Sequence, residues 1–373
     1  MSSQSRHLTF QDDVIFNLGE LPLELFEEIA SYLDILSLEA LSLTSSIHRA
    51  VCIRLLFHTL TLYGDHGHSS TSNFVEDLEN QSPVASFRKV MLEGVKEDLS
   101  EGLLPWCTRV HNVKLRWSLV GNTAILPTLI FLNDLELNNI IFPSMAEYFG
   151  LLAGLSPTLK RLRAHSNTFI ESQSICHSVG RGTGLKVLDT RSGDDLTLRL
   201  RDDCPISLKL LQVFHARHAR PHDVEDLLRR TPSLVDLSIE FKRRGHRPVS
   251  FPLARLKLLS IRDRTEYARQ TIQLLSAPSD VPYPLQTFAF TCFVYNDLRK
   301  LVTALSKPTF RSVKEIYLRL LAPRYIPINE CFFAFNANIG RFKRMLEAKS
   351  GRKISLNTRL AYIDPSEILS SSP

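Results

Sequence analysis

The sequence predicts an α/β protein in which an N-terminal helical module precedes a long array of short parallel strands with helices on their outer side. Two observations lead to this prediction. Residues 21–51 carry Leu and Ile at helical spacing. From residue 57 onward, a six-residue apolar pattern recurs eleven times, at intervals of about 26 residues. A chain of 373 residues, 44% of them hydrophobic, can supply the core that such an array needs.

The helical module begins at Leu21 and Pro22, because proline is tolerated in the first turn of a helix. Leu25, Ile29 and Leu33 then recur every four residues, which places them on one face of the helix. A tail at residues 1–17 precedes the module. The first helix therefore presents a continuous apolar stripe.

A second short helix carries Leu38 and Leu41, and Ser45 or Ser46 can begin a third. Together the three helices, at residues 18–58, have more apolar surface than they can cover among themselves. We therefore predict that the module docks on another protein. The alternative is an ordinary helical hairpin that packs on the rest of the chain.

The repeated pattern is h-x-x-h-x-h, where h is apolar, as in LNDLEL at 132–137 and LVDLSI at 234–239. Amphipathic segments such as VEDLLRRTPS lie between the copies, and each ends near a proline that stops a helix. Residues 59–322 should thus form parallel strands with outer helices. A doubly wound α/β domain is the alternative, but short, nearly equal steps favour a solenoid. The fourth positions of the copies are residues 60, 90, 113, 135, 162, 188, 211, 237, 259, 288 and 316.

The C-terminal region, residues 323–373, has a different pattern. Phe335, Ile339, Phe342 and Leu346 fall on one helical face. An array of repeats needs a terminal element that covers its last open core. We expect a C-terminal helical cap followed by a tail.

Side chains between the apolar positions of each copy should face the inner, concave side of the array, because strand side chains alternate. Their charges are mixed in sign, and Phe214 offers an aromatic anchor, as protein interfaces tend to do. Simple solvated strand residues are the alternative for each one. The candidate target-binding residues are Lys114, Arg116, Asp134, Glu136, Arg161, Arg163, His165, Asp189, Arg191, Gln212, Phe214, Asp236, Glu240 and Arg262.

Two family resemblances follow from these patterns. The array resembles an irregular leucine-rich repeat. The N-terminal module resembles the F-box, through Leu21, Pro22, Glu24, Ile29, Tyr32, Leu33, Leu38, Leu41 and the turn at Thr44, Ser45 and Ser46. The F-box resemblance implies binding to the adaptor subunit of an SCF-type cullin–RING ubiquitin ligase, and through it to the cullin. Adaptor contacts would then be Leu21, Pro22, Leu25, Ile29, Leu33, Leu38 and Leu41.

The expected function is that of a substrate receptor, which promotes ubiquitin-dependent degradation of an unknown target protein and catalyses no reaction itself. A non-degradative scaffold of the same architecture is the alternative, and an enzyme such as a hydrolase is less favoured. No phosphate-binding loop with G-K-[ST], no G-x-S-x-G and no H-E-x-x-H motif is present.

Composition excludes further classes of function. A net charge of +6, from 45 basic and 39 acidic residues, does not indicate a nucleic-acid-binding protein. No apolar run is long enough to span a membrane, and the first residues lack the apolar core of a secretory signal. The six cysteines are widely spaced, and His215, His218 and His222 lack companion ligands, so we expect no metal and no cofactor. Reduced cysteines favour a cytoplasmic or nuclear protein.

Overall fold

The computed structural model describes most of the chain. The described residues are 21–56, 59–64, 87–96, 98–99, 103–104, 107, 109–171, 184–190, 204–219, 221–241, 253–263, 269–276, 281–294, 298–323 and 327–363. The tail predicted at residues 1–17 and the candidate contact Arg191 lie outside these ranges.

A twelve-stranded, entirely parallel sheet forms most of the molecule. Its spatial order is the order of the strands in the chain, except that β5 and β7 form a separate two-stranded sheet. The predicted α/β class with parallel strands is confirmed. The strands are β1 (Thr59–Tyr63), β2 (Lys89–Glu93), β3 (Asn112–Arg116), β4 (Asp134–Asn138), β5 (Ile141–Ser144), β6 (Arg161–His165), β7 (Thr168–Glu171), β8 (Val187–Thr190), β9 (Val213–Ala219), β10 (Asp236–Phe241), β11 (Leu258–Arg262), β12 (Thr287–Phe293), β13 (Glu315–Pro323) and β14 (Ser355–Ile363).

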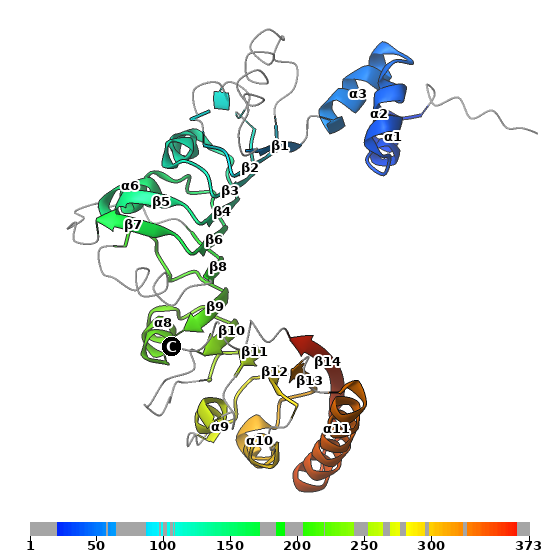
Figure 1. Ribbon diagram of the computed structural model, residues 1–373, viewed down its shortest axis with the longest axis vertical. Helices are drawn as coiled ribbons and strands as arrows, with labels where there is room; N and C mark the ends of the chain where they lie inside the picture. The colour runs from blue at the N-terminus through cyan, green and yellow to red at the C-terminus, as the bar shows by residue number, and fades with distance from the viewer. Residues whose placement is uncertain are drawn as a thin grey trace, which may run out of the picture.

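The strands follow an arc, and the helices between them lie on its outer side (Figure 1). Most of these helices stop within a few residues of a proline, as the sequence predicts. Within the described part of the chain, no helix has both the length and the apolar character of a membrane span. The helices are α1 (Leu23–Ala30), α2 (Ile35–Ser42), α3 (Ser46–Leu56), the 3-10 helix η3 (Val120–Thr128), α6 (Met145–Gly154), α8 (Pro221–Arg230), α9 (Arg269–Ser276), α10 (Arg299–Leu305), the 3-10 helix η4 (Pro308–Phe310) and α11 (Ile328–Ser350).

The register of the sheet follows the apolar pattern. Val113 on β3 lies opposite Leu135 on β4, which in turn lies opposite Leu162 on β6. These side chains are buried in one core that runs along the whole sheet, between the strands and the outer helices. The residues that alternate with them face the opposite side, which we call the inner face of the sheet.

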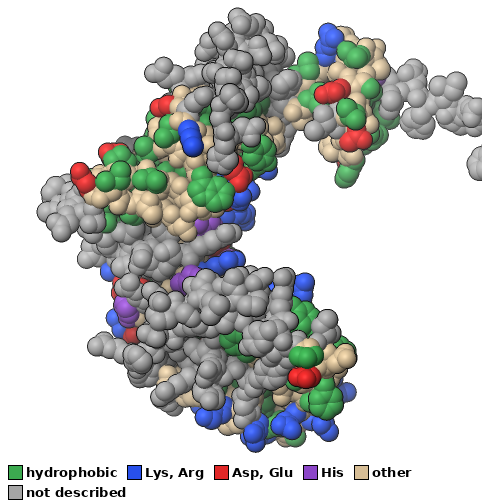
Figure 2. Space-filling view, in the orientation of Figure 1, with side chains coloured by type: hydrophobic (Ala, Val, Ile, Leu, Met, Phe, Trp, Pro, Cys, Tyr) green, Lys and Arg blue, Asp and Glu red, His purple; other side chains and the backbone are tan. Residues whose placement is uncertain are grey.

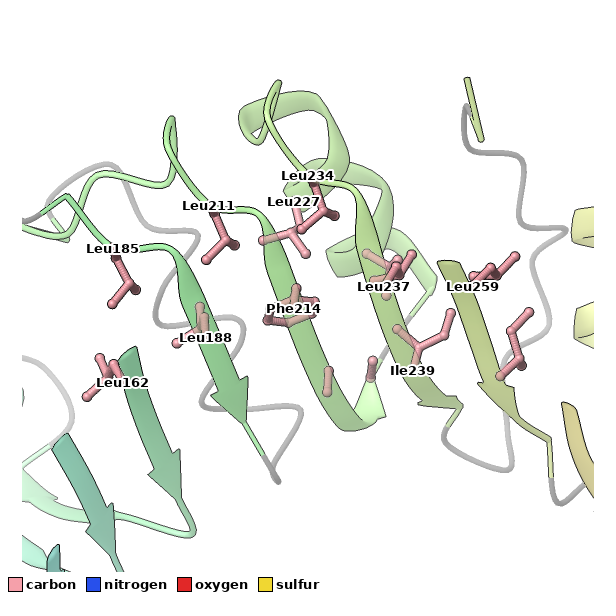
Figure 3. Packing of buried hydrophobic residues seen from close by; sticks show 14 of the residues in the cluster. Leu162, Leu185, Leu188, Leu211, Phe214, Leu227, Leu234, Leu237, Ile239 and Leu259 are labelled. Atoms are coloured by element: carbon pink, nitrogen blue, oxygen red, sulfur yellow. The ribbon is translucent and has the colours of Figure 1, made fainter. Parts of the chain in front are cut away.

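The observed register of β9 differs from the predicted one. The sequence pattern places its fourth position at Leu211, whereas the structure places Phe214 opposite both Leu188 and Leu237. Figure 3 shows Phe214 in the same row as these two leucines, beneath Leu227 of α8. Phe214 is 0% exposed, so its assignment as a concave-face contact is wrong. His215 occupies the inner-face position of this strand.

The C-terminal region contains the predicted helix and one strand that the pattern does not predict. In α11, Phe342 and Leu346 are buried in the main core, and Phe335 and Ile339 pack against it. The chain then adds β14 to the sheet beside β13. The last element of the sheet is therefore a strand, and α11 packs against α10 and β14.

Left-handed turns follow several strands at the same level of the sheet. Gly94, Trp117, Asn139 and Ser166 have φ angles of 72°, 47°, 55° and 53° and follow β2, β3, β4 and β6. The amide of Trp117 donates to the carbonyl of Asn138 at 3.0 Å, which extends the strand pairing by one residue. A positive φ has a conformational cost for a bulky residue such as Trp117.

Candidate functional site

The first candidate surface is the apolar face of α1–α3. These helices have a small core of their own, made of Phe26, Ala30, Leu38, Val51 and Cys52, which is separate from the core of the sheet. Figure 1 shows the three helices beyond β1, at one end of the arc. Five buried residues cannot cover the remaining apolar side chains.

Those remaining side chains are exposed. Leu25, Ile29 and Leu33, the predicted stripe of the first helix, are 48%, 46% and 37% exposed. Phe26 and Ala30, on the other side of α1, are turned into the small core. The helical spacing thus separates a buried face from an exposed one, and both are apolar.

The other predicted adaptor contacts differ in their placement. Pro22 is exposed, whereas Leu21 and Leu41 are half-buried against the small core. Leu38 is buried inside that core and stabilises the module instead of facing outward. The structure adds exposed apolar residues that the sequence analysis did not name as contacts, namely Leu23, Tyr32, Leu36, Leu43 and Ile47.

Local interactions hold these helices in place. The Asp34 side chain accepts a hydrogen bond from the amide of Ser37 at 2.7 Å and so caps α2. This bond lowers the pKa of the Asp34 carboxyl. The Ser45 hydroxyl oxygen accepts from the amide of His48, and the His48 ring stacks on Phe26 with centroids 4.5 Å apart. The turn between α2 and α3 is thus tied to α1.

The second candidate surface is the inner face of the sheet, where Figure 2 shows Lys and Arg side chains along the inner edge of the arc. Three adjacent strands contribute six charged residues that lie close together. We call these six residues the charged cluster: Lys114 and Arg116 on β3, Asp134 and Glu136 on β4, and Arg161 and Arg163 on β6. The sequence analysis predicted all six as inner-face residues.

Glu136 is the centre of the charged cluster. Arg116 donates to its Oε1 from Nε at 2.9 Å and from Nη2 at 2.7 Å. Its Oε2 lies 3.7 Å from Lys114 Nζ and 3.6 Å from Arg163 Nη1. Asp134 accepts a hydrogen bond from Arg161 at 3.1 Å and lies 3.7 Å from Arg163. Two carboxylates therefore bind four cations.

The charge of Glu136 is stabilised in spite of its burial. Burial by itself raises the pKa of a carboxyl group. The hydrogen bonds and the charge of Arg116, together with the charges of Lys114 and Arg163, outweigh burial and hold the pKa of Glu136 below its usual value. Glu136 is thus an ionised anchor beneath the cations.

The remaining predicted inner-face residues are less closely connected. Glu240 pairs with Arg262 at 3.3 Å on the neighbouring strands β10 and β11. His165 is buried, Asp189 is half-buried, and Gln212 precedes β9. Burial raises the pKa of Asp236, and the electrostatic interaction with His215 opposes this effect. Of these residues, Asp189 lies opposite Arg163 at the edge of the charged cluster.

Among the described residues, no group of three or more His, Cys, Asp or Glu side chains is arranged to hold a metal ion. Comparison with protein-family models found no match, and a search of curated proteins found none. The two candidate surfaces are therefore defined by the structure alone. One is apolar and lies on the helices α1–α3, and the other is charged and lies on the sheet.

Proposed function

We propose that the protein is the substrate-recruiting subunit of an SCF-type cullin–RING ubiquitin ligase. In this proposal α1–α3 are an F-box and bind the adaptor subunit. The sheet with its outer helices is an irregular leucine-rich-repeat solenoid, and its inner face binds the target protein. The protein performs no chemistry. It raises the concentration of the target near the ubiquitin-loaded enzyme and so accelerates transfer.

The observation that carries the proposal is the uncovered apolar face of α1–α3. Leu25 and Ile29 lie on α1 and Leu33 follows it, and nothing in the described part of the chain buries these three side chains. Burial of a Leu or Ile side chain is worth about 1.5–3 kcal/mol. Because these side chains are already about half-buried, a partner that covers two of them gains a factor of roughly ten to one hundred in affinity.

The separation of the two hydrophobic cores also favours a protein that binds two partners. The helical module packs around Phe26 and Val51, and the sheet packs around its own long core. Each surface therefore belongs to a separately packed part of the chain. A partner bound to the helices need not compete with one bound to the inner face.

The test is capture of the purified adaptor subunit by the full-length protein. In the variant Leu25→Asp/Ile29→Asp, two carboxylates replace exposed apolar groups, so we expect adaptor binding to fall by about a hundredfold or more. The control Ile141→Asp/Ile170→Asp makes the same kind of change at residues that are 60% and 75% exposed on β5 and β7. Equal capture of the wild type and the α1 variant would reject the proposal.

Thermal unfolding of each variant separates lost binding from lost folding. Because the substituted residues are exposed, the melting temperatures should stay close to that of the wild type. A reconstituted ubiquitination assay with proteins captured on the inner face then distinguishes a degradative receptor from a non-degradative scaffold, since only the receptor supports ubiquitin transfer to them.

A further inference from the structure

The charged cluster has more positive than negative charge. Its four cations, Lys114, Arg116, Arg161 and Arg163, face two carboxylates, Asp134 and Glu136. Two positive charges therefore remain after pairing. A concave protein surface strengthens the field of such an excess, because its walls exclude water.

The carboxylates lie beneath the cations. The Glu136 side chain is 4% exposed and that of Asp134 is 21% exposed, whereas the four cationic side chains are 28–44% exposed. An approaching partner therefore meets ammonium and guanidinium groups first. Hydrogen bonds to these carboxylates hold Arg116 and Arg161 in position, so little of their side-chain entropy is lost when an anion binds.

Two of the cations, Lys114 and Arg163, have N–H donors that make no hydrogen bond to the carboxylates of the cluster. The carboxylate oxygens nearest Lys114 Nζ and Arg163 Nη1 are 3.7 Å and 3.6 Å away, which is too long for a hydrogen bond. An ammonium group has three N–H donors and a guanidinium group has five. Lys114 and Arg163 can therefore donate to an incoming anion without giving up a hydrogen bond to these carboxylates.

The extent of the charged cluster limits the size of its ligand. Three adjacent strands span about 10 Å, the length of roughly three residues of extended peptide. Carboxylates border it on both sides: Glu93 on β2 lies opposite Arg116, and Asp189 on β8 lies opposite Arg163. A nucleic acid carries a charge every few ångströms along its length and would extend over these carboxylates. A short acidic segment would not.

We propose that the charged cluster binds a short acidic segment of the target protein, two or three Asp or Glu side chains long, through Lys114, Arg116, Arg161 and Arg163. This inference rests on the proposed function, because it names the chemistry by which the inner face recognises a target. Bidentate guanidinium–carboxylate contacts, with the ammonium of Lys114 as a further donor, would hold the segment across β3, β4 and β6.

The test uses fluorescence polarisation of the full-length protein with two labelled probe peptides. One has the sequence Gly-Ser-Glu-Glu-Glu-Ser-Gly, and the other has Gln in place of each Glu. We expect saturable binding of the Glu peptide at low salt, at least tenfold weaker binding of the Gln peptide, and a steady loss of affinity as salt is added. Equal affinity for both peptides, or no saturable binding up to about 1 mM, would overturn the proposal.

Two substitutions test the assignment to these residues. Arg163→Gln and Lys114→Gln should each weaken binding of the Glu peptide about tenfold. Arg319→Gln on β13 is the matched control, because Arg319 is exposed on the same sheet far from the charged cluster and should leave the affinity unchanged. Unchanged binding by both cluster variants, with melting temperatures equal to that of the wild type, would contradict the proposal.

A single-stranded DNA oligonucleotide with as many charges as the Glu peptide serves as competitor. Tighter binding of the oligonucleotide would indicate that the charged cluster binds a nucleic acid instead of an acidic segment. This result would overturn the proposal. Adaptor capture is measured on the same variants and should not change. If the wild-type protein captures the adaptor but does not bind the Glu peptide, the acidic ligand alone is refuted. If the wild-type protein binds the peptide but does not capture the adaptor, the ligase function alone is refuted.

Discussion

Arg116 on β3 donates two hydrogen bonds to a single oxygen of Glu136 on β4, at 2.9 Å and 2.7 Å, across 20 residues of sequence. In the strand register Glu136 lies opposite Lys114, so the contact with Arg116 is diagonal. In this geometry the second carboxylate oxygen of Glu136 points toward Lys114 and Arg163. One buried anion thereby fixes cations from the strands on both of its sides.

Substitution of this anion should destabilise the fold. Glu136→Gln keeps the shape of the side chain but leaves three neighbouring cations without their shared counter-charge. We expect a loss of about 1–3 kcal/mol in the free energy of unfolding, measured by urea denaturation. The control Glu225→Gln breaks an exposed pair with Arg229 on α8 and should cost at most about 0.5 kcal/mol. Equal losses in both variants would show that Glu136 has no special structural role.

The contribution of Glu136 should also depend on pH. Its pKa is lower in the folded protein than the usual value of 4.5, so the unfolded chain binds more protons in acid. The stabilisation is therefore complete above about pH 5 and is lost as the pH falls through the folded pKa. Unfolding of the wild type and of Glu136→Gln, measured between neutral pH and about pH 3, should give free energies that converge in acid. A difference that is constant over this range would contradict the assignment.

The corrected register of β9 makes a separate prediction. Phe214→Ala removes a fully buried ring between Leu188 and Leu237 and should cost about 3–5 kcal/mol in stability. Gln212→Ala, two residues earlier and before the strand, should change stability by less than about 0.5 kcal/mol. Urea denaturation of the two variants distinguishes the observed register from the one centred on Leu211, in which Phe214 would face the inner side.

Local sequence predicts the strands where only one register fits the apolar pattern. Leu135 and Leu162 occupy the predicted core positions because their flanking residues are polar. In LKLLQVFHA, by contrast, Leu208, Leu211 and Phe214 are spaced three apart, so two overlapping frames both fit. Only packing against Leu188 and Leu237 selects the second frame.

The strand β14 could not be predicted from the same pattern. In its frame Lys353 and Thr358 occupy positions that are apolar in most other strands, although Leu356 pairs with Ile316 as the frame requires. Pairing along the full length of β13 compensates for the missing apolar side chains. Here a long-range contact, absent from local sequence, decides the structure.

The charged cluster was predictable only in part. Alternation along each strand places Lys114, Glu136 and Arg163 on one face. The repeat frame also places these three in one row, because each directly follows a fourth position of the pattern, and the strand pairing has this register. The pattern does not show which cations bind which carboxylate. Nor does it show that Glu136 is buried beneath the cations.

A close approach of two glycines near the first strands gives the last prediction. Gly64 follows β1, and a Cβ atom at this position would overlap the backbone of Gly94, closer to its carbonyl oxygen than any real contact. The amide of Gly64 also donates to the carbonyl of Glu93 at 2.8 Å. Gly64→Ala should therefore separate the ends of β1 and β2 and reduce the free energy of unfolding by about 1–3 kcal/mol.

Gly150 provides the matched comparison for this substitution. It lies on the exposed side of α6, and a Cβ atom there would meet nothing within 4 Å. Gly150→Ala should raise stability by about 0.5–1 kcal/mol, because alanine restricts the unfolded chain and favours the helix. Urea denaturation should thus give changes of opposite sign for the same chemical substitution. A stabilising Gly64→Ala would mean that β1 and β2 do not approach each other as closely as the register requires.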